Sequence, residues 1–187
     1  MSYLNKLKRE IAWIATFLFF IWAVFILDQL LPLEAFGLRP RSVFGLIGIP
    51  SMTFLHGSLS HILSNSVPLL TLLLLLASFR GKSIPIVIAI VLMGGSLLWL
   101  VGQPNSIHIG ASLLVFGLAG YLITNGLFFQ RKVINTIISI IVLFSYGGAL
   151  FSGFSPWQQG VSWDGHLCGF IAGIAAAYLQ SKSILLK

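Results

Sequence analysis

The chain has 187 residues, of which 57% are hydrophobic and only 8% are charged, and its net charge is +7. Soluble domains usually carry about 25% charged residues, so this composition excludes a soluble globular protein, and it is too apolar for a disordered one. The apolar residues form long unbroken runs rather than short alternating segments. We therefore predict an all-α protein that crosses a membrane several times, and not a transmembrane barrel.

A helix needs about 20 apolar residues to cross the hydrocarbon core of a bilayer. In chain order, the runs predict six spans at about residues 11–31, 61–79, 84–101, 112–129, 133–151 and 166–181. The first run follows a basic segment, as in a signal peptide, but it is longer than a signal core and no small-residue cleavage site follows. We expect a retained anchor and a single domain over residues 1–187.

Six spans place both termini on the same side of the membrane, and nine of the eleven Lys and Arg residues fall on that side. These nine are Lys6, Lys8, Arg9, Arg80, Lys82, Arg131, Lys132, Lys182 and Lys187. Only Arg39 and Arg41 fall on the other side. Because positively charged loops stay in the cytoplasm, both termini are expected to be cytoplasmic. The basic charge then reflects topology, and no nucleic acid partner is expected.

Polar side chains gather where three spans enter the membrane from the extracytoplasmic side. The second span begins with His61 and Asn65, the fourth with Ser112 and the sixth with His166. Residues four apart share a helix face, so His61 and Asn65 point the same way. Since polar groups inside a membrane are costly, they are functional candidates by default.

Small residues accompany these groups and predict a close approach of the fourth and sixth spans. Gly110 precedes Ser112, and such a helix start offers backbone N–H groups to a developing negative charge. Gly169 and Gly173 leave one face of the sixth span nearly bare, which permits close helix contact. That contact would bring His166 beside Ser112, giving a nucleophile with an adjacent general base.

Other polar residues on this side have simpler interpretations. We expect Cys168 to be a small packing residue on the opposite face from His166. His108 and Asp164 are expected to be solvated loop residues; the less favoured alternative for Asp164 is that it orients His166. A metal site is not favoured, because His56 and His61 lack ligand spacing on one helix face and no acidic residue within the spans completes a zinc set.

Three segments carry a family resemblance: HGSLSHILSN at 56–65, GASLLVFG at 110–117 and GHLCGFIAG at 165–173. With the first-loop sequence GLRPRSVFGLIGIP at 37–50, they resemble the rhomboid family of intramembrane serine proteases. The resemblance implies a minimal bacterial-type, six-helix rhomboid-like bundle in the inner (cell) membrane. It also implies a serine endopeptidase that needs no cofactor and whose partners are the lipid bilayer and transmembrane protein substrates.

The resemblance assigns roles residue by residue. Ser112 matches the nucleophile and His166 the general base of a dyad. His61 and Asn65 match oxyanion-hole side chains, joined by the Ser112 backbone N–H, and Gly110 belongs to the same oxyanion and substrate-binding group.

Supporting positions also match. His56 corresponds to a mainly structural histidine, and Phe116 to an aromatic ring that packs on the catalytic imidazole. Gly169 and Gly173 correspond to the close contact of the fourth and sixth spans.

Two features depart from the family pattern. Leu113 stands after the serine where glycine is usual, and the effect of the larger side chain on the pocket and on substrate access is left open. The first loop is short and lacks a Trp-Arg motif, which leaves the details of lateral substrate entry open as well. Neither departure removes a reacting group, so an active enzyme is expected.

Two other classes of function stay open on the sequence. One is a rhomboid-like protein that binds transmembrane helices without cutting them, against which the presence of both Ser112 and His166 argues. The other is a small channel or transporter, which would need polar residues through the full membrane depth. The natural substrate, the cleavage preference and the oligomeric state are not encoded in any recognisable pattern.

Overall fold

The computed structural model describes residues 3–78, 83–130, 132–157 and 160–182. Within these residues the chain is helical, apart from loops and one isolated bridge between Leu38 and His108. The long helices are α1 (Tyr3–Asp28), α3 (Leu59–Ser78), α4 (Ser83–Val101), α5 (Ser112–Thr124), α6 (Val133–Gly153) and α7 (Trp163–Ser181). The shorter elements are η1 (Leu33–Phe36), η2 (Phe44–Ile47), α2 (Gly48–Ser51), η3 (Met52–Phe54) and the π-helix η4 (Asn125–Phe129).

Each predicted span coincides with one long helix, with differences at the ends. The largest difference is in α1, which begins at Tyr3 rather than at Ile11 because its basic first turns continue the helix beyond the apolar run. The end of the predicted second span at Phe79 lies outside the described residues, as do Arg80, Lys82, Arg131 and Lys187.

Among the described residues, five helices are long and apolar enough to cross a membrane: α1, α3, α4, the continuous α5–η4 helix, and α6. The sixth predicted span corresponds to α7, which is helical over 19 residues but is less apolar. It carries Asp164, His166 and Gln180, all of them buried. The neighbouring helices, rather than lipid, therefore surround the polar side chains of α7.

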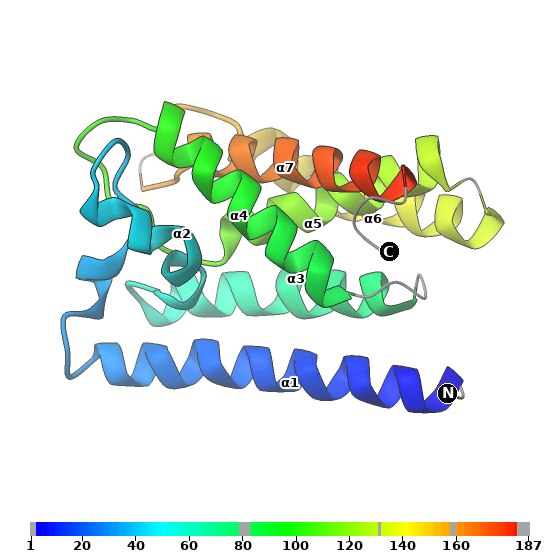
Figure 1. Cartoon of the computed structure of the whole chain (residues 1–187), viewed down its shortest axis with the longest axis horizontal. Helices are drawn as coiled ribbons and strands as arrows, with labels where there is room; N and C mark the ends of the chain where they lie inside the picture. The colour runs from blue at the N-terminus through cyan, green and yellow to red at the C-terminus, as the bar shows by residue number, and fades with distance from the viewer. Residues whose placement is uncertain (1–2, 79–82, 131, 158–159, 183–187) are drawn as a thin grey trace.

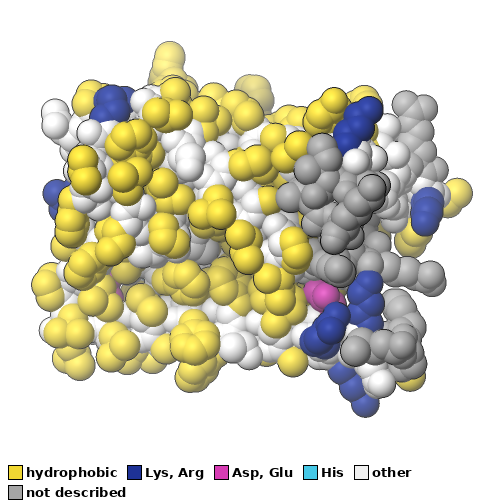
Figure 2. All heavy atoms as spheres, viewed as in Figure 1, with side chains coloured by type: hydrophobic (Ala, Val, Ile, Leu, Met, Phe, Trp, Pro, Cys, Tyr) yellow, Lys and Arg dark blue, Asp and Glu magenta, His cyan; other side chains and the backbone are white. Residues whose placement is uncertain are grey.

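The helices run along the length of the molecule, with α4 crossing the others obliquely (Figure 1). The start of α1 and the end of α7 lie at the same end of the bundle, and the loops after α1 and α4 lie at the opposite end (Figure 1). The face in Figure 2 is largely hydrophobic, and its Lys and Arg side chains lie towards the two ends. This distribution is the one expected of a protein with a lipid-covered middle.

Helix α5 forms the centre of the bundle, and every residue from Leu113 to Ile123 is buried. Its most extensive contact is with α7. A Cβ added at Gly169 or Gly173 would overlap the backbone carbonyl of Leu113 or Gly117, respectively. The two backbones thus approach more closely than any residue with a side chain permits, as the glycine spacing predicts.

Candidate active site

A cavity of about 740 Å³ lies between the first half of α3, the start of α5 and the loop before it, the end of α6, and the start of α7 and the loop before it. Five of the predicted site residues line it: His61, Asn65, Ser112, Phe116 and His166. Because α3, α5 and α7 start at this end, their first turns converge on one space. The predicted polar side chains of three separate spans therefore share a single cavity, which is the arrangement that a catalytic site needs.

Ser112 is the first residue of α5, and the chain reaches it through a constrained turn. Gly110 has a φ of +110°, a conformation that residues with a side chain rarely adopt. A Cβ at Gly110 would also lie only 2.6 Å from Nε2 of His61. Both facts require glycine at this position, and the turn keeps His61 next to the start of α5.

The N–H groups in the first turn of a helix have no acceptor within that helix. The two N–H groups just before α5 have partners outside the helix. The Gly110 N–H donates to the Met52 carbonyl at 2.8 Å, and the Ala111 N–H donates to Nε2 of His56 at 3.3 Å. The first N–H of α5 proper is that of Ser112, at the edge of the cavity. It is placed to donate to a negative charge that develops beside the serine.

The imidazole of His166 is held on two sides. Its ring stacks on Phe116, with centroids 3.9 Å apart and planes only 6° from parallel. Its Nδ1 lies 2.9 Å from the carbonyl oxygen of Gly153, at the end of α6. A carbonyl only accepts hydrogen bonds, so Nδ1 carries the proton and Nε2 is left as the basic nitrogen.

Gly153 is a site residue that the sequence did not reveal. A Cβ there would overlap the Phe116 ring and lie 3.0 Å from Nδ1 of His166, so only glycine lets the α6 backbone come this near. Its role lies in a backbone carbonyl, which leaves no side-chain signature. The single hint in the sequence is a glycine near the end of an apolar span.

Two polar side chains of α3 face the same cavity. Asn65 is buried, and its amide nitrogen donates to the His61 carbonyl at 2.9 Å. An amide nitrogen has two hydrogens, so one is left for a ligand. His61 and Asn65 thus line the same cavity as Ser112, where the resemblance puts an oxyanion hole.

His56 lies beneath this group, fully buried, and does not line the cavity. Burial, together with a smaller effect of the neighbouring His61, lowers the pKa of His56 to about 4. The neutral ring can then accept the Ala111 N–H through Nε2. This bond fixes the turn before Ser112, which agrees with a structural rather than a reacting histidine.

The departure at Leu113 has a local explanation in the packing around its side chain. Its side chain is buried away from the cavity, in a cluster with Leu38, Met52, Leu98 and Cys168. A Cβ at Gly94 of α4 would lie 3.0 Å from the leucine side chain, so a glycine opposite provides its space. The same cluster confirms Cys168 as a packing residue.

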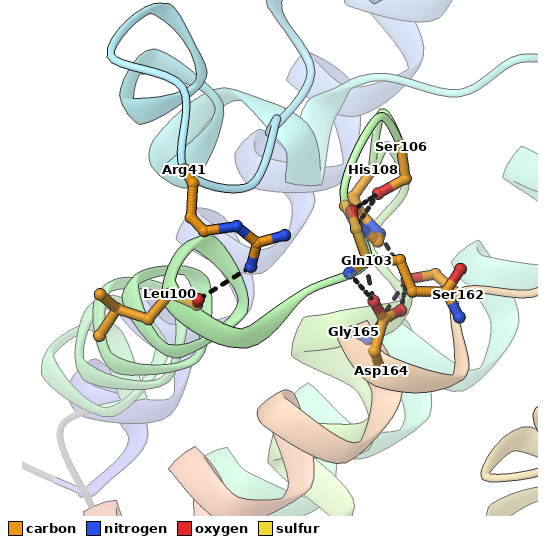
Figure 3. Close-up of polar contacts among 8 residues, drawn as sticks. All are labelled: Arg41, Leu100, Gln103, Ser106, His108, Ser162, Asp164 and Gly165. Atoms are coloured by element: carbon orange, nitrogen blue, oxygen red, sulfur yellow. Dashed lines mark hydrogen bonds and ion pairs between the residues drawn. The ribbon is translucent and has the colours of Figure 1, made fainter.

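The expectation of solvated loop residues at His108 and Asp164 is wrong. Both are buried, each about 6% exposed, and both line the cavity. Figure 3 shows them in a hydrogen-bonded group that joins the loop after α4 to the start of α7. Burial lowers the pKa of His108, partly opposed by the negative charge of Asp164. Hydropathy alone predicted that these residues are exposed to water, because the residues that bury them come from distant parts of the chain.

The described residues contain no group of three or more His, Cys, Asp or Glu side chains arranged to hold a metal ion. The cavity is lined by Ser112, at the start of α5, and by His166. The Gly153 carbonyl binds Nδ1 of His166 and leaves Nε2, the basic nitrogen, available. His61 and Asn65 of a third helix, α3, also line the cavity. These features define a helical membrane protein with a serine- and histidine-lined cavity at one end of the bundle.

The comparison with known proteins gives the family. Residues 43–183 match the family model of the rhomboid domain, and the chain belongs to the rhomboid family. Rhomboid domains are characteristic of intramembrane serine proteases, although some members are inactive. The matched region begins after α1 and includes every cavity-lining helix.

Mycobacterial relatives are similar over most of this chain. An uncharacterized protein of Mycobacterium tuberculosis is 39% identical over 178 residues, which is 90% of this chain and 74% of the relative. An uncharacterized protein of Mycobacterium leprae is 38% identical over 193 residues, covering 95% of this chain and 76% of the relative. These relatives carry no functional name, so they support the family and not a substrate.

Proposed function

We propose that this protein is an intramembrane serine endopeptidase that uses Ser112 as nucleophile and His166 as general base. The observation that carries the proposal is the environment of His166. Its ring is stacked on Phe116 and its Nδ1 proton is held by the Gly153 carbonyl, inside the cavity that Ser112 lines. A positioned imidazole with a free basic nitrogen is what activation of a serine hydroxyl requires.

The reaction would follow the order of other serine hydrolases. His166 Nε2 takes the proton of the Ser112 hydroxyl as the oxygen attacks a peptide carbonyl. The oxyanion is stabilised by His61, Asn65 and the Ser112 backbone N–H. His166 then protonates the leaving amine, and a water molecule hydrolyses the acyl-enzyme. No step calls for a metal or an organic cofactor.

The topology that we propose puts this cavity on the extracytoplasmic side of a bacterial cell membrane. Lys6, Lys8, Arg9, Lys132 and Lys182 belong to the opposite end of the bundle, which holds the start of α1 and the end of α7. Because basic residues are retained in the cytoplasm, that end would be cytoplasmic. Hydrolysis needs water, and a cavity at the extracytoplasmic end of the bundle would admit it.

This placement predicts where substrates are cut. A peptide bond must be extended to reach Ser112, and unwinding a helix deep in lipid exposes backbone groups at several kcal/mol each. Unwinding near the aqueous edge is easier, and Gly or Pro there weakens the helix. We expect cleavage of single-span proteins near the extracytoplasmic end of their span.

The proposal is tested by incubating the purified protein in detergent with a single-span substrate and identifying the fragments by mass spectrometry. Ser112→Ala and His166→Ala should abolish cleavage while the protein stays folded. Ser145→Ala is the matched control, because Ser145 is exposed on α6 outside the cavity. Cleavage that persists in Ser112→Ala, or that a chelator inhibits, contradicts the dyad. Cuts in the cytoplasmic half of the substrate helix contradict the topology.

A further inference from the structure

The hydrogen-bonded group in Figure 3 includes residues that lie four positions before each of the two residues proposed to react. His108 precedes Ser112 by four positions, and Ser162 precedes His166 by four positions. Nδ1 of His108 and Oγ of Ser162 lie 2.7 Å apart and form a hydrogen bond between segments 54 residues distant in the chain. A cross-link of this kind couples the loop that leads into α5 to the loop that leads into α7.

Asp164 adds a second connection between the same two segments. Its Oδ2 accepts the Gln103 N–H at 3.0 Å, and its Oδ1 accepts the Gly165 N–H at 2.9 Å and the Ser162 hydroxyl at 3.1 Å. The carboxylate thus binds the first residues after α4 and the first turn of α7 together. His108 also faces this carboxylate, with Nε2 3.8 Å from Oδ2.

Within this group, the Ser162 hydroxyl oxygen makes hydrogen bonds with His108, Asp164 and Gly165. The Ser106 hydroxyl donates to the Gln103 carbonyl at 2.6 Å, so Ser106 accepts a hydrogen from Nε2 of His108 at 2.8 Å. The Ser162 hydroxyl donates to Asp164 Oδ1, and the Ser162 oxygen lies within hydrogen-bond distance of His108 Nδ1. Ser162 also accepts the Gly165 N–H at 3.3 Å, as the N-cap of α7.

The loop that carries His108 is also anchored on its far side. His108 and Leu38 exchange two backbone hydrogen bonds, at 2.8 and 3.0 Å, which tie the loop to the segment after η1. Arg41 of that segment in turn donates to the Leu100 carbonyl at the end of α4, at 3.1 Å (Figure 3). His108 is therefore a fixed point, and its bond to Ser162 can hold the start of α7 in place.

We propose that His108, Ser162 and Asp164 form a clamp that positions the His166 imidazole against Ser112. The inference rests on the proposed function, and the three are positioning residues, because they act through the first turns of α5 and α7. The α5–α7 glycine contact fixes how near the helices approach, and the clamp fixes their rotation and height at the end where the reaction occurs. Misplacement of reacting groups by about 1 Å can cost 10²-fold in rate.

The test compares His108→Ala, Ser162→Ala and Ser162→Thr with the wild-type protein. Asn105→Gly is the matched control in the same loop, because Asn105 has a φ of +63° that glycine adopts readily. Two activities are measured: cleavage of a single-span substrate, and the rate at which a serine-directed fluorophosphonate labels Ser112. Hydrogen–deuterium exchange of residues 163–170 is measured in parallel, since it needs no activity.

If the clamp positions the dyad, the two alanine variants lower kcat and the labelling rate together, by roughly 10- to 100-fold, with KM unchanged. Ser162→Thr keeps the hydroxyl and restores most of both rates. His108→Ala speeds hydrogen–deuterium exchange in the first turn of α7, even though His108 is not part of that helix. Asn105→Gly leaves this exchange unchanged. If His108→Ala does not fold, Ser162→Ala still tests the clamp.

Unchanged kcat and labelling in an active protein overturn the clamp, as does an effect confined to KM. If the wild-type protein neither cleaves nor is labelled, the proposed function fails instead. The exchange measurement then decides the clamp: faster exchange in α7 of His108→Ala retains the coupling, and unchanged exchange overturns it.

Discussion

Helices α5 and α1 are both apolar, but they occupy opposite kinds of environment. In the most apolar stretch of α5 and η4, 72% of the residues are buried, against 17% in α1. Phe19 and Phe20 of α1 are more than half exposed, whereas every residue of α5 from Leu113 to Ile123 is buried. Helix α1 borders the bundle, and α5 is enclosed by α3, α4, α6 and α7.

The difference explains how a membrane protein tolerates a reactive polar site. Polar groups and irregular backbone are disfavoured in lipid, but they are accepted where protein surrounds them or where they line a cavity. Ser112 and the turn at Gly110 lie at the start of the enclosed helix, next to the cavity. The peripheral α1 carries no cavity-lining residue. Changes in the α5–α7 region should therefore have large effects on activity, and changes on the outer face of α1 small ones.

The largest effect is expected from Gly169→Ala. The added methyl group would overlap the Leu113 carbonyl and push α7 away from α5. Overpacking costs about 1–3 kcal/mol of stability, but the separation of His166 from Ser112 should lower kcat by about 10²-fold or more. Gly148→Ala on α6 is the control, since a Cβ there meets nothing within 4 Å. A fully active Gly169→Ala enzyme would show that the helix contact does not position the site.

A smaller effect is expected from Asn65→Ala. Removal of one oxyanion donor costs about 10²–10³-fold in rate in other serine hydrolases. Three donors share the charge here, so we expect a loss at or below the low end of that range, roughly 10- to 100-fold in kcat. Steady-state cleavage kinetics measure it, with circular dichroism as the check of folding. An unchanged kcat in a folded variant would remove Asn65 from the oxyanion site.

Phe116→Leu should have a moderate effect. The stacked contact with His166 would be lost, while the site stays apolar. Aromatic contacts contribute about 0.5–1.5 kcal/mol beyond their buried area, which corresponds to a fall in kcat of about 2- to 12-fold. Phe128→Leu, at an exposed position of η4, is the matched control. Equal activity of the two variants would mean that the ring does not hold the imidazole.

The smallest effect is expected from Phe19→Leu on α1. This side chain is 67% exposed on the outer face, so substitution should change unfolding free energy by no more than about 0.5 kcal/mol and leave kcat unchanged. Thermal unfolding in detergent and the cleavage assay measure both quantities. A large loss of either would place α1 in the functional part of the molecule and break the contrast with α5.

The sequence predicts the helices and most of the cavity because both depend on patterns within single segments. Long apolar runs specify the positions of the six long helices, and the polar residues at three helix starts predict that His61, Ser112 and His166 line one cavity. Glycine spacing specifies the α5–α7 contact at Gly169 and Gly173. The short elements between α1 and α3 carry no such pattern and were not predicted.

The missed parts of the site depend on contacts between distant segments. Gly153 contributes a backbone carbonyl, which has no side-chain pattern. His108 and Asp164 look like loop residues until the fold brings Gln103 and Ser162 beside them. The tolerance of Leu113 likewise depends on Gly94 of another helix. Such pairings need three-dimensional information, because neither partner alone departs from an ordinary composition.

The central claim is that His166 activates Ser112, and site-specific labelling tests it most directly. A serine-directed fluorophosphonate should modify the folded protein on a single residue, identified as Ser112 by mass spectrometry of the labelled peptide. Labelling should disappear in Ser112→Ala and slow by orders of magnitude in His166→Ala, while Ser145→Ala behaves as wild type. Modification of another serine, or an unchanged rate in His166→Ala, would contradict the account.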